Sequence, residues 1–367
     1  MPTYAFSGSL TRPMPQYGAA NGRGIACLAF DDATGRLTPL GETHGIDDTG
    51  WLVLDPRRKV LYATCEQPGA DQSAVAAYAV NPTSGHLLLL NTQPTLGGEV
   101  CHASLSIDGR LLLVANYNGA TPAGWPEDSI AVFPISTDGS LGPVVSSVRH
   151  HGSGPHPSRQ TTAHAHCIVP SPDGRLVYVA DLGMDRLVAY ALGLDGSLSR
   201  QSGGDFALPP GLGPRHLVFQ PGGQFLFMVS ELIPTVMSFS VDPQTGALSE
   251  RHALAIPSLG QTMVQPAGIV LTADGLHIFV SLRVCNGILG LRVDEATGLL
   301  TQTGRWSSGG VTPRDLALSP SGNHLIVANQ DSDTLTVFAV DQRQGTLSGP
   351  IEQRPVGTPM AIKIAVF

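Results

Sequence analysis

The chain has 367 residues and a formal net charge of −8, with 42% hydrophobic and 14% charged residues, 43 glycines and 29 prolines. This composition is too apolar for a disordered chain and too rich in turn-forming residues for a helical bundle. The negative charge argues against a nucleic-acid partner, which requires a basic face. Lys59 and Lys363 are the only lysines, which disfavours enzymes that work through a Schiff base.

The N-terminus and the cysteines set expectations about location. The first residues lack the basic segment and apolar core of a secretory signal, and no apolar run approaches the roughly 18 residues of a membrane span. The five cysteines are odd in number and form no CxxC pair, so they indicate neither a disulfide framework nor a zinc site. We therefore expect a cytoplasmic protein with no membrane partner.

A unit of strand, turn and strand recurs along the chain. Each copy has a short apolar run, a four-residue turn similar to Pro-Asp-Gly-Arg, and a second apolar run. The glycine of the turn supplies the positive φ that two closely paired antiparallel strands need. The copies begin at Leu52, Ser104, Ile168, Leu217, Gly268 and Leu316. A third apolar strand and a polar fourth strand follow each copy, and four antiparallel strands per roughly 50 residues are typical of a propeller blade.

The two ends of the chain complement one another. Residues 4–8, 25–30 and 36–38 match the second, third and fourth strands of a blade that lacks its first strand. Residues 361–367 supply that strand from the C-terminus, and this pairing removes the last free edge. The sequence thus predicts an all-β fold, a single seven-bladed β-propeller domain over residues 1–367 whose ring is closed by the C-terminal strand. A pair of β-sandwiches is the alternative, but it would not give seven equal periods.

Polar residues stand at the start of the inner strands, where an ordinary core would have Val or Ile. Because the first strand of every blade lines the channel of a propeller, equivalent positions converge on one axis, and they hold Cys101, His102, His166, Arg215, His216 and Arg314. The ends of the second strands return to the same face and add Asp181, Glu231 and Arg283, while His164 lies two residues before His166. Arginines and carboxylates are rarely buried unless they are paired or functional. The sequence therefore predicts a polar site at one mouth of the channel.

Structural interpretations compete with functional ones for several of these residues. Asp181 shares a blade position with two asparagines and is expected to hydrogen-bond loop backbone. Arg314 and Asp315 are alternatively an ion pair between blades, and His102 and His216 are alternatively core histidines.

Other chemistries find less support in the sequence. His164 and His166 are two residues apart on one strand and so could form a metal pair, but no further His or Asp cluster joins them. The cysteines near the channel lack a paired base, and no Gly-x-Ser-x-Gly segment indicates a serine hydrolase. We predict no metal and no organic cofactor.

Several motifs occur in a fixed order along the chain: Arg159-Gln160, His164-Ala165-His166, Pro172-Asp173-Gly174-Arg175, Asp181–Asp185, Gly213–His216 with Phe219, Ser230-Glu231-Leu232, Pro313-Arg314 and Ala328–Asp333. In these motifs, which cover essentially the full chain, the sequence resembles the seven-bladed lactonase family that includes bacterial 6-phosphogluconolactonase and the fungal carboxy-cis,cis-muconate cyclase. The resemblance implies an active site that contains His166 (or His164), Arg215, Glu231 and Arg283. One departure from the family pattern is that Leu282 and Val284, both apolar, flank Arg283.

Substrate-binding roles are expected for five further residues: His102, His164, His216, Asp181 and Arg314. In the predicted reaction one arginine stabilises the oxyanion of the opening ester, Glu231 or His166 activates water, and the second arginine holds a carboxylate or phosphate. The sequence thus predicts a monomeric lactonase that acts on a small anionic sugar lactone, such as 6-phosphoglucono-1,5-lactone in the pentose phosphate pathway. A lactonising enzyme of the carboxymuconate cyclase type, another sugar-acid lactonase, and a non-catalytic propeller that binds proteins remain alternatives.

Overall fold

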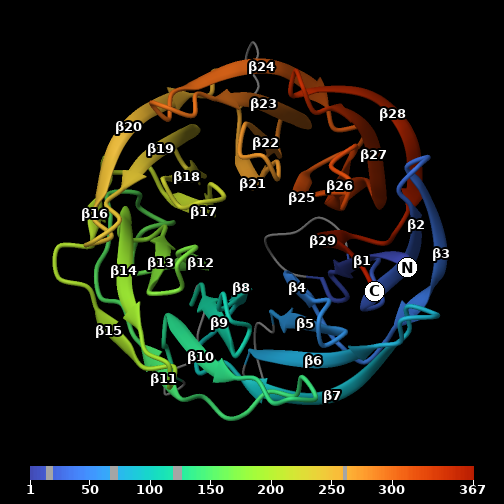
Figure 1. The fold of residues 1–367 in the computed structure, drawn as a ribbon, viewed down its shortest axis with the longest axis horizontal. Helices are drawn as coiled ribbons and strands as arrows, with labels where there is room; N and C mark the ends of the chain where they lie inside the picture. Colours follow the sequence, from blue (N-terminus) through green and yellow to red (C-terminus); the bar gives the residue numbers. More distant parts are fainter. Residues whose placement is uncertain (14–19, 67–72, 119–125, 259–262) are drawn as a thin grey trace.

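The structure, a computed structural model, describes residues 1–13, 20–66, 73–118, 126–258 and 263–367. Its strands form seven antiparallel sheets that are arranged as the blades of a ring (Figure 1). The seven-bladed β-propeller predicted from the repeat is confirmed. Within the described residues, no helix is both long enough and apolar enough to cross a bilayer.

The blades are numbered from the N-terminus, and the strands of each are given from the inside of the ring outward. Blade 1 contains β29 (Pro359–Val366), β1 (Thr3–Ser9), β2 (Ile25–Asp31) and β3 (Arg36–Thr43). Blade 2 contains β4 (Leu52–Asp55), β5 (Val60–Cys65), β6 (Ala74–Val80) and β7 (Leu87–Pro94). Blade 3 contains β8 (Val100–Leu105), β9 (Leu111–Asn116), β10 (Ile130–Pro134) and β11 (Ser146–Val148). Blade 4 contains β12 (Ala165–Pro170), β13 (Leu176–Asp181), β14 (Arg186–Leu192), β15 (Leu198–Arg200) and the short β16 (Phe206–Ala207).

The remaining blades repeat the same order. Blade 5 contains β17 (Pro214–Phe219), β18 (Phe225–Ser230), β19 (Thr235–Val241) and β20 (Leu248–Ala255). Blade 6 contains β21 (Pro266–Leu271), β22 (His277–Leu282), β23 (Gly287–Val293) and β24 (Leu300–Ser307). Blade 7 contains β25 (Pro313–Leu318), β26 (His324–Asn329), β27 (Thr334–Asp341) and β28 (Thr346–Pro355), with a single 3-10 turn, Gln330–Ser332, after β26.

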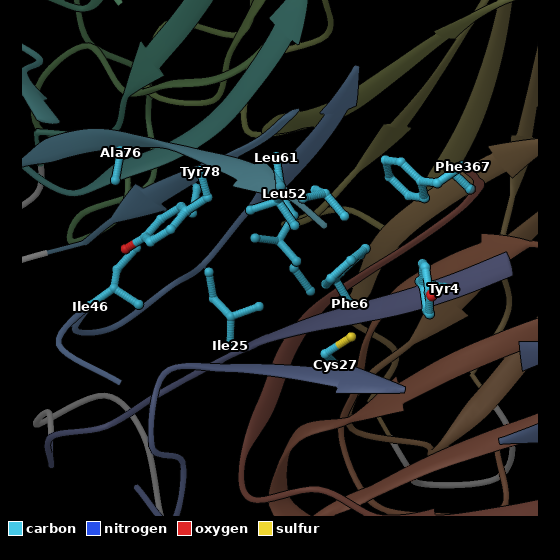
Figure 2. Packing of buried hydrophobic residues seen from close by; sticks show 14 of the residues in the cluster. Tyr4, Phe6, Ile25, Cys27, Ile46, Leu52, Leu61, Ala76, Tyr78 and Phe367 are labelled. Atoms are coloured by element: carbon cyan, nitrogen blue, oxygen red, sulfur yellow. The ribbon is translucent and has the colours of Figure 1, made fainter. Parts of the chain in front are cut away.

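The hydrophobic core lies between neighbouring blades. The second strands, such as β5 and β18, are buried along their whole length because each is covered by the blades on both sides. Between blades 1 and 2, Phe6, Leu52 and Phe367 pack together (Figure 2), and the rings of Phe6 and Phe367 meet edge to face at 6.1 Å. A separate apolar cluster fills each of the other blade interfaces.

The ring is closed as the sequence predicts, by antiparallel pairing of β29 with β1. Both ends of the chain therefore lie in blade 1 (Figure 1). Lys363 on β29 also joins blade 1 to its two neighbours. Its Nζ lies 2.7 Å from Oδ2 of Asp315 in blade 7 and 3.8 Å from the centre of the Trp51 ring, next to β4 of blade 2. Asp315 thus pairs with Lys363 and not with Arg314, which corrects the ion pair considered from the sequence.

Turns between third and fourth strands connect one blade to the previous one. In blade 5 the turn before β20 reaches blade 4, where the hydroxyl of Tyr178 donates a hydrogen bond of 2.5 Å to the carbonyl oxygen of Gly246. Gly246 has a φ of +73°, and a Cβ placed on it would lie 2.0 Å from Cδ1 of Leu176. Only glycine fits this position without displacing its neighbours. The glycines of the repeat therefore do more than form turns, because they also let adjacent blades approach closely.

Candidate active site

A cavity of about 550 Å³ lies at the end of the ring where the inner strands begin. Blades 2 to 7 and the loops beside them contribute to its lining. Its charged lining residues are Glu66, Glu99, Glu231, Arg159, Arg215, Arg283 and Arg314. Of the residues predicted from the sequence, six line the cavity: His164, His166, Arg215, Glu231, Arg283 and Arg314.

A β-bulge at the start of the inner strands directs one side chain from each of several blades toward the cavity. In blade 4 the register between β12 and β13 shifts between Ala165 and Cys167, which leaves His166 as the extra residue. A bulge breaks the alternation of a strand and reorients the side chain of the extra residue. The same shift in blades 3, 5 and 7 leaves as extra residues Cys101, Arg215 and Arg314. All four side chains line the cavity.

A second set of lining residues directly follows the second strands. Glu66 and Glu231 each donate a backbone hydrogen bond to a carbonyl oxygen just before the inner strand of the same blade, at 2.9 Å to Asp48 and 2.8 Å to Gly213. Tyr117 and Arg283 stand at the same position in blades 3 and 6. One repeated backbone contact therefore brings different side chains to the same mouth of the ring.

Glu231 is the centre of the charge cluster. Its Oε1 lies 2.6 Å from Nη2 of Arg159, and its Oε2 lies 3.0 Å from both Nε of Arg215 and Nη2 of Arg283. Burial alone would raise the pKa of Glu231, but Arg283, Arg159 and Arg215 outweigh it and hold this pKa well below the usual range. Glu231 thus stays ionised, and its main physical effect is to hold three guanidinium groups together, of which those of Arg215 and Arg283 are largely buried.

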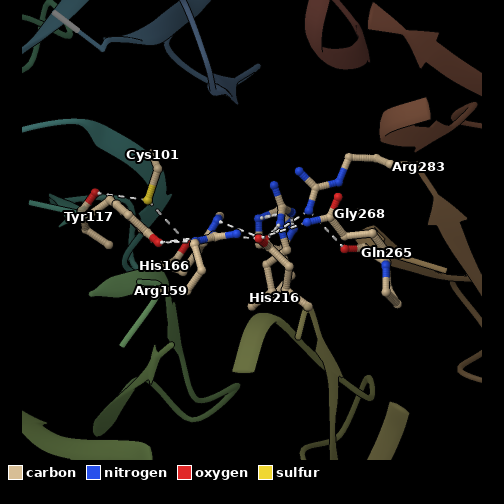
Figure 3. Close-up of polar contacts among 12 residues, drawn as sticks. Cys101, Tyr117, Arg159, His166, His216, Gln265, Gly268 and Arg283 are labelled. Atoms are coloured by element: carbon tan, nitrogen blue, oxygen red, sulfur yellow. Dashed lines mark hydrogen bonds and ion pairs between the residues drawn. The ribbon is translucent and has the colours of Figure 1, made fainter. Parts of the chain in front are cut away.

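His166 lies beside this cluster, with Nε2 4.0 Å from Oε2 of Glu231. Figure 3 shows His166, Arg159 and Arg283 approaching one another from different blades and loops. Burial and the positive charge of Arg215 lower the pKa of His166 well below its usual value, so the imidazole is neutral. Its Nδ1 has no hydrogen-bond partner among the described residues. A neutral imidazole has one unprotonated ring nitrogen that can accept a proton.

Tyr117 connects His164 to Arg159. The ring of His164 stacks on Tyr117 with 4.4 Å between centroids, and its Nδ1 lies 2.7 Å from the backbone carbonyl oxygen of Tyr117. Nη2 of Arg159 donates a hydrogen bond of 3.1 Å to the hydroxyl of Tyr117. The orientation of His164 is therefore set by protein contacts, whereas His166 keeps a nitrogen without a partner.

His102 and His216 do not line this cavity. Their rings lie 5.4 Å apart and both pack against Trp51, and Nη1 of Arg215 donates a hydrogen bond of 3.0 Å to Nε2 of His216. Burial lowers the pKa of both imidazoles well below the usual value, with a further contribution from the charge of Arg215 on His216. The structure places them in a neutral packing layer beside Arg215 and His166. At this position they do not reach a substrate in the cavity.

Asp181 is also placed away from the cavity. Its Oδ1 accepts a hydrogen bond of 2.8 Å from the backbone N–H of His164, and its Oδ2 lies 2.6 Å from Nδ1 of His150. Nε2 of His150 in turn lies 2.8 Å from the hydroxyl of Tyr190. Asp181 therefore holds the backbone at the start of β12, as expected for a structural role, and positions the strand that carries His166.

Some lining residues were not predicted as site residues. Glu66 and Tyr117 occupy the blade position of Glu231 and Arg283, so the repeat contains the signal that could have found them. Arg159 and Gln265 lie in the loop before β12 and just before β21, outside the aligned strands. Among the described residues, no group of three or more His, Cys, Asp or Glu side chains is placed to hold a metal ion.

Comparisons with known proteins agree with this fold. The family model described as "Lactonase, 7-bladed beta-propeller" matches residues 5–364. The 6-phosphogluconolactonase of Bacillus subtilis is 30% identical over 348 residues, which cover 95% of this chain and 96% of that protein. The 6-phosphogluconolactonase of Formosa agariphila is 28% identical over 347 residues, covering 93% and 94%. The solved structure of the periplasmic gluconolactonase PpgL of Pseudomonas aeruginosa is 33% identical with a TM-score of 0.90, and the match covers 100% of both chains. The chain therefore belongs to the lactonase family of seven-bladed β-propellers.

Proposed function

We propose that this protein hydrolyses an anionic sugar lactone, with 6-phosphoglucono-1,5-lactone as the first candidate substrate. The observation that carries the proposal is the buried cluster in which Glu231 fixes Arg159, Arg215 and Arg283 around one cavity. The names of the relatives support the same reaction class, since they include 6-phosphogluconolactonases and a gluconolactonase.

The arginines suit the two charges that such a reaction must stabilise. Opening a lactone places negative charge on the carbonyl oxygen, and a fixed guanidinium in a sheltered site stabilises that charge by about 3 kcal/mol. Arg215 and Arg283 lie side by side on Glu231 and can share this role. Arg159 and Arg314 also line the cavity, where they can bind a phosphate or carboxylate of the substrate, because a planar guanidinium binds such groups through two hydrogen bonds.

Water activation falls to His166 in this proposal. The sequence leaves Glu231 and His166 as alternative bases, but both oxygens of Glu231 already accept from arginines and are not available to orient a water molecule. His166 lines the cavity and is neutral, so one of its ring nitrogens can accept a proton. General-base catalysis of this kind contributes about a hundredfold or more.

The first experiment compares substrates. Proton release from 6-phosphoglucono-1,5-lactone, glucono-1,5-lactone and carboxymuconolactone is followed in a pH-stat with the purified chain. We expect turnover of the phosphorylated lactone well above spontaneous hydrolysis, and preference for it over the uncharged lactone reports the anion site. No release above background from any of the three would favour a protein-binding propeller, and preference for carboxymuconolactone would favour the cyclase-type reaction.

A matched pair of arginine variants tests the site. Arg283→Met removes a cavity guanidinium, and we expect kcat/KM to fall by about a hundredfold or more. Arg251→Met changes an exposed arginine on β20 and should leave kcat/KM unchanged. Equal activity of the two variants would contradict the proposed site.

Two finer parts of the proposal concern conditions in the cell. We propose a role in the pentose phosphate pathway in the cytoplasm, and fractionation of the native host tests the compartment, since PpgL is described as periplasmic.

We also propose that turnover needs no metal. Dialysis against EDTA should leave kcat unchanged, and a loss that Zn²⁺ or Mg²⁺ restores would overturn this point.

A further inference from the structure

Glu66 is a second buried carboxyl group of the same cavity. It directly follows β5 in blade 2, whereas Glu231 follows β18 in blade 5, so the two lie three blades apart in a ring of seven. Both side chains line the cavity, with exposed fractions of 6% for Glu66 and 3% for Glu231. A substrate in the cavity therefore has one carboxyl group on each side.

The two carboxyl groups differ in their partners. Glu231 accepts from three guanidinium groups. Within the part of the chain that the structure describes, no side chain forms an ion pair with the Glu66 carboxyl group. The carboxyl group nevertheless packs closely on Gly50. A Cβ atom added to Gly50 would lie only 1.8 Å from Oε1 of Glu66. A buried carboxyl group without a protein partner is available to a ligand in the cavity.

The charged surroundings of Glu66 are mixed. Burial, with the negative charges of Glu99 and Asp48, raises the pKa of Glu66 to about 7 against the opposing effect of Arg314 and Arg215. Cys101, the remaining titratable neighbour, has a pKa raised well above its usual value by burial and stays a neutral thiol. Near neutral pH, Glu66 can therefore carry a proton, while Glu231 cannot. Carboxyl groups whose pKa values are driven apart in one site commonly take different roles in proton transfer.

We propose that Glu66 is the proton donor to the ring oxygen of the lactone when the ester bond breaks. This assignment rests on the proposed lactone hydrolysis. It makes Glu66 a further catalytic residue.

The step balances as follows. His166 takes one proton from water, the water oxygen bonds to the carbonyl carbon, and the carbonyl electron pair moves to the oxygen beside Arg215 and Arg283. When that pair re-forms the carbonyl, the bond from carbon to the ring oxygen breaks. The ring oxygen keeps the bonding electrons and takes the proton of Glu66. The protonated imidazole returns a proton to the Glu66 carboxylate through solvent, so one lactone and one water give one hydroxy acid.

The experiment compares Glu66→Gln with the control Glu42→Gln, which changes an exposed glutamate on β3. Each is assayed on a 1,5-lactone and on the matching thiolactone, in which sulfur replaces the ring oxygen. A thiolate leaves without prior protonation, so only the oxygen lactone needs the donor. We expect Glu66→Gln to lower kcat on the oxygen lactone by about a hundredfold and on the thiolactone by less than about threefold. Glu42→Gln should match the wild type on both.

The pH profile gives a second, independent measurement on the wild type. Activity on the oxygen lactone should fall as the pH rises above about 7, because the donor loses its proton, and this alkaline fall should be absent with the thiolactone. Since this comparison uses the native protein, it holds even if the variant folds poorly.

The outcomes separate the two proposals. Unchanged kcat in Glu66→Gln, equal losses on lactone and thiolactone, or the same pH profile for both substrates would each overturn the role of Glu66 and leave lactone hydrolysis standing. Failure of the wild type to turn over any lactone would overturn both.

Discussion

Glu231 and its three arginines form a buried ionic cluster whose members depend on one another. Taking charges out of water costs several kcal/mol per ion, and this cost is offset only when opposite charges meet in good geometry. The distances from Glu231 to Arg159, Arg215 and Arg283 are between 2.6 and 3.0 Å. Removing the carboxylate leaves three guanidinium groups, two of them largely buried, close together without a counter-charge.

The cluster gives a stability prediction. We expect Glu231→Gln to destabilise the fold by about 3–5 kcal/mol, because it leaves buried guanidinium groups without their counter-charge. Millimolar phosphate should restore part of that loss by binding the guanidinium groups from the cavity, and should affect the wild type less. Thermal unfolding with and without phosphate measures both effects. Glu127→Gln breaks an exposed pair with Arg149 and should cost under about 1 kcal/mol. Equal losses in the two variants would contradict this account of the cluster.

The contribution of Glu66 to the stability of the fold should depend on pH in the opposite sense to that of a salt-bridged carboxylate. Its pKa is about 7 in the folded state, above the usual 4.5, so the folded protein binds this proton more tightly than the unfolded chain does. The stabilising contribution is complete below about pH 4.5 and is lost as the pH rises to about 7. We expect Glu66→Gln to be more stable than the wild type at pH 8, by about 3 kcal/mol, and the difference to vanish near pH 4.5. Urea denaturation at the two pH values checks this, and a pH-independent difference would contradict it.

At the scale of strands and turns, the repeat could be predicted from the sequence, but the bulge at the start of the inner strands could not. The apolar runs and turn glycines predict every blade and the closure by the C-terminal strand. Simple alternation would place His164 and His166 on one strand face, but β12 begins only at Ala165, and its pairing with β13 leaves His166 as an extra residue. The bulge depends on backbone pairing between two strands, which no single run of residues encodes. Arg159 was not predicted as a site residue because its loop is not part of the repeat. Its pairing with Glu231 depends on how that loop folds over blade 4.

The turn glycines give a prediction at this scale. Gly246→Ala forces a side chain to adopt a φ of +73° and into contact with Leu176 of the neighbouring blade. We expect a loss of about 2–4 kcal/mol, from the backbone conformation together with overpacking. Gly203→Ala has a nearly equal φ of +71° but nothing within 4 Å, so it should show the smaller backbone cost alone, about 1 kcal/mol. Urea midpoints of the two variants measure the difference, and equal midpoints would mean that the blade contact contributes nothing.

At the scale of the whole molecule, the ring is held where its ends meet. Lys363 pairs with Asp315 of blade 7 and lies over Trp51 next to blade 2, so one side chain contacts both neighbours of blade 1. The side chain of Asp315 is 4% exposed and also accepts a hydrogen bond of 3.0 Å from the backbone N–H of Ile362.

The junction is tested by replacing the lysine. We expect Lys363→Met to lower stability by about 2 kcal/mol, because Asp315 stays buried without its partner. The double variant Lys363→Met with Asp315→Asn should recover part of this loss, since no uncompensated charge remains. Lys59→Met, at the other and exposed lysine, should change stability by less than about 0.5 kcal/mol. Additive losses in the double variant would show that the pair is not coupled.

The closing strand has a consequence for how the protein is made. β1 leaves the ribosome well before β29, the strand with which its inner edge pairs. With roughly 350 residues between them and synthesis at about 5–20 residues per second, β1 waits tens of seconds with an unpaired edge. An unpaired and largely apolar strand can pair with the wrong chain during that interval. The nascent protein is therefore most open to misassembly at blade 1 until β29 has been synthesised.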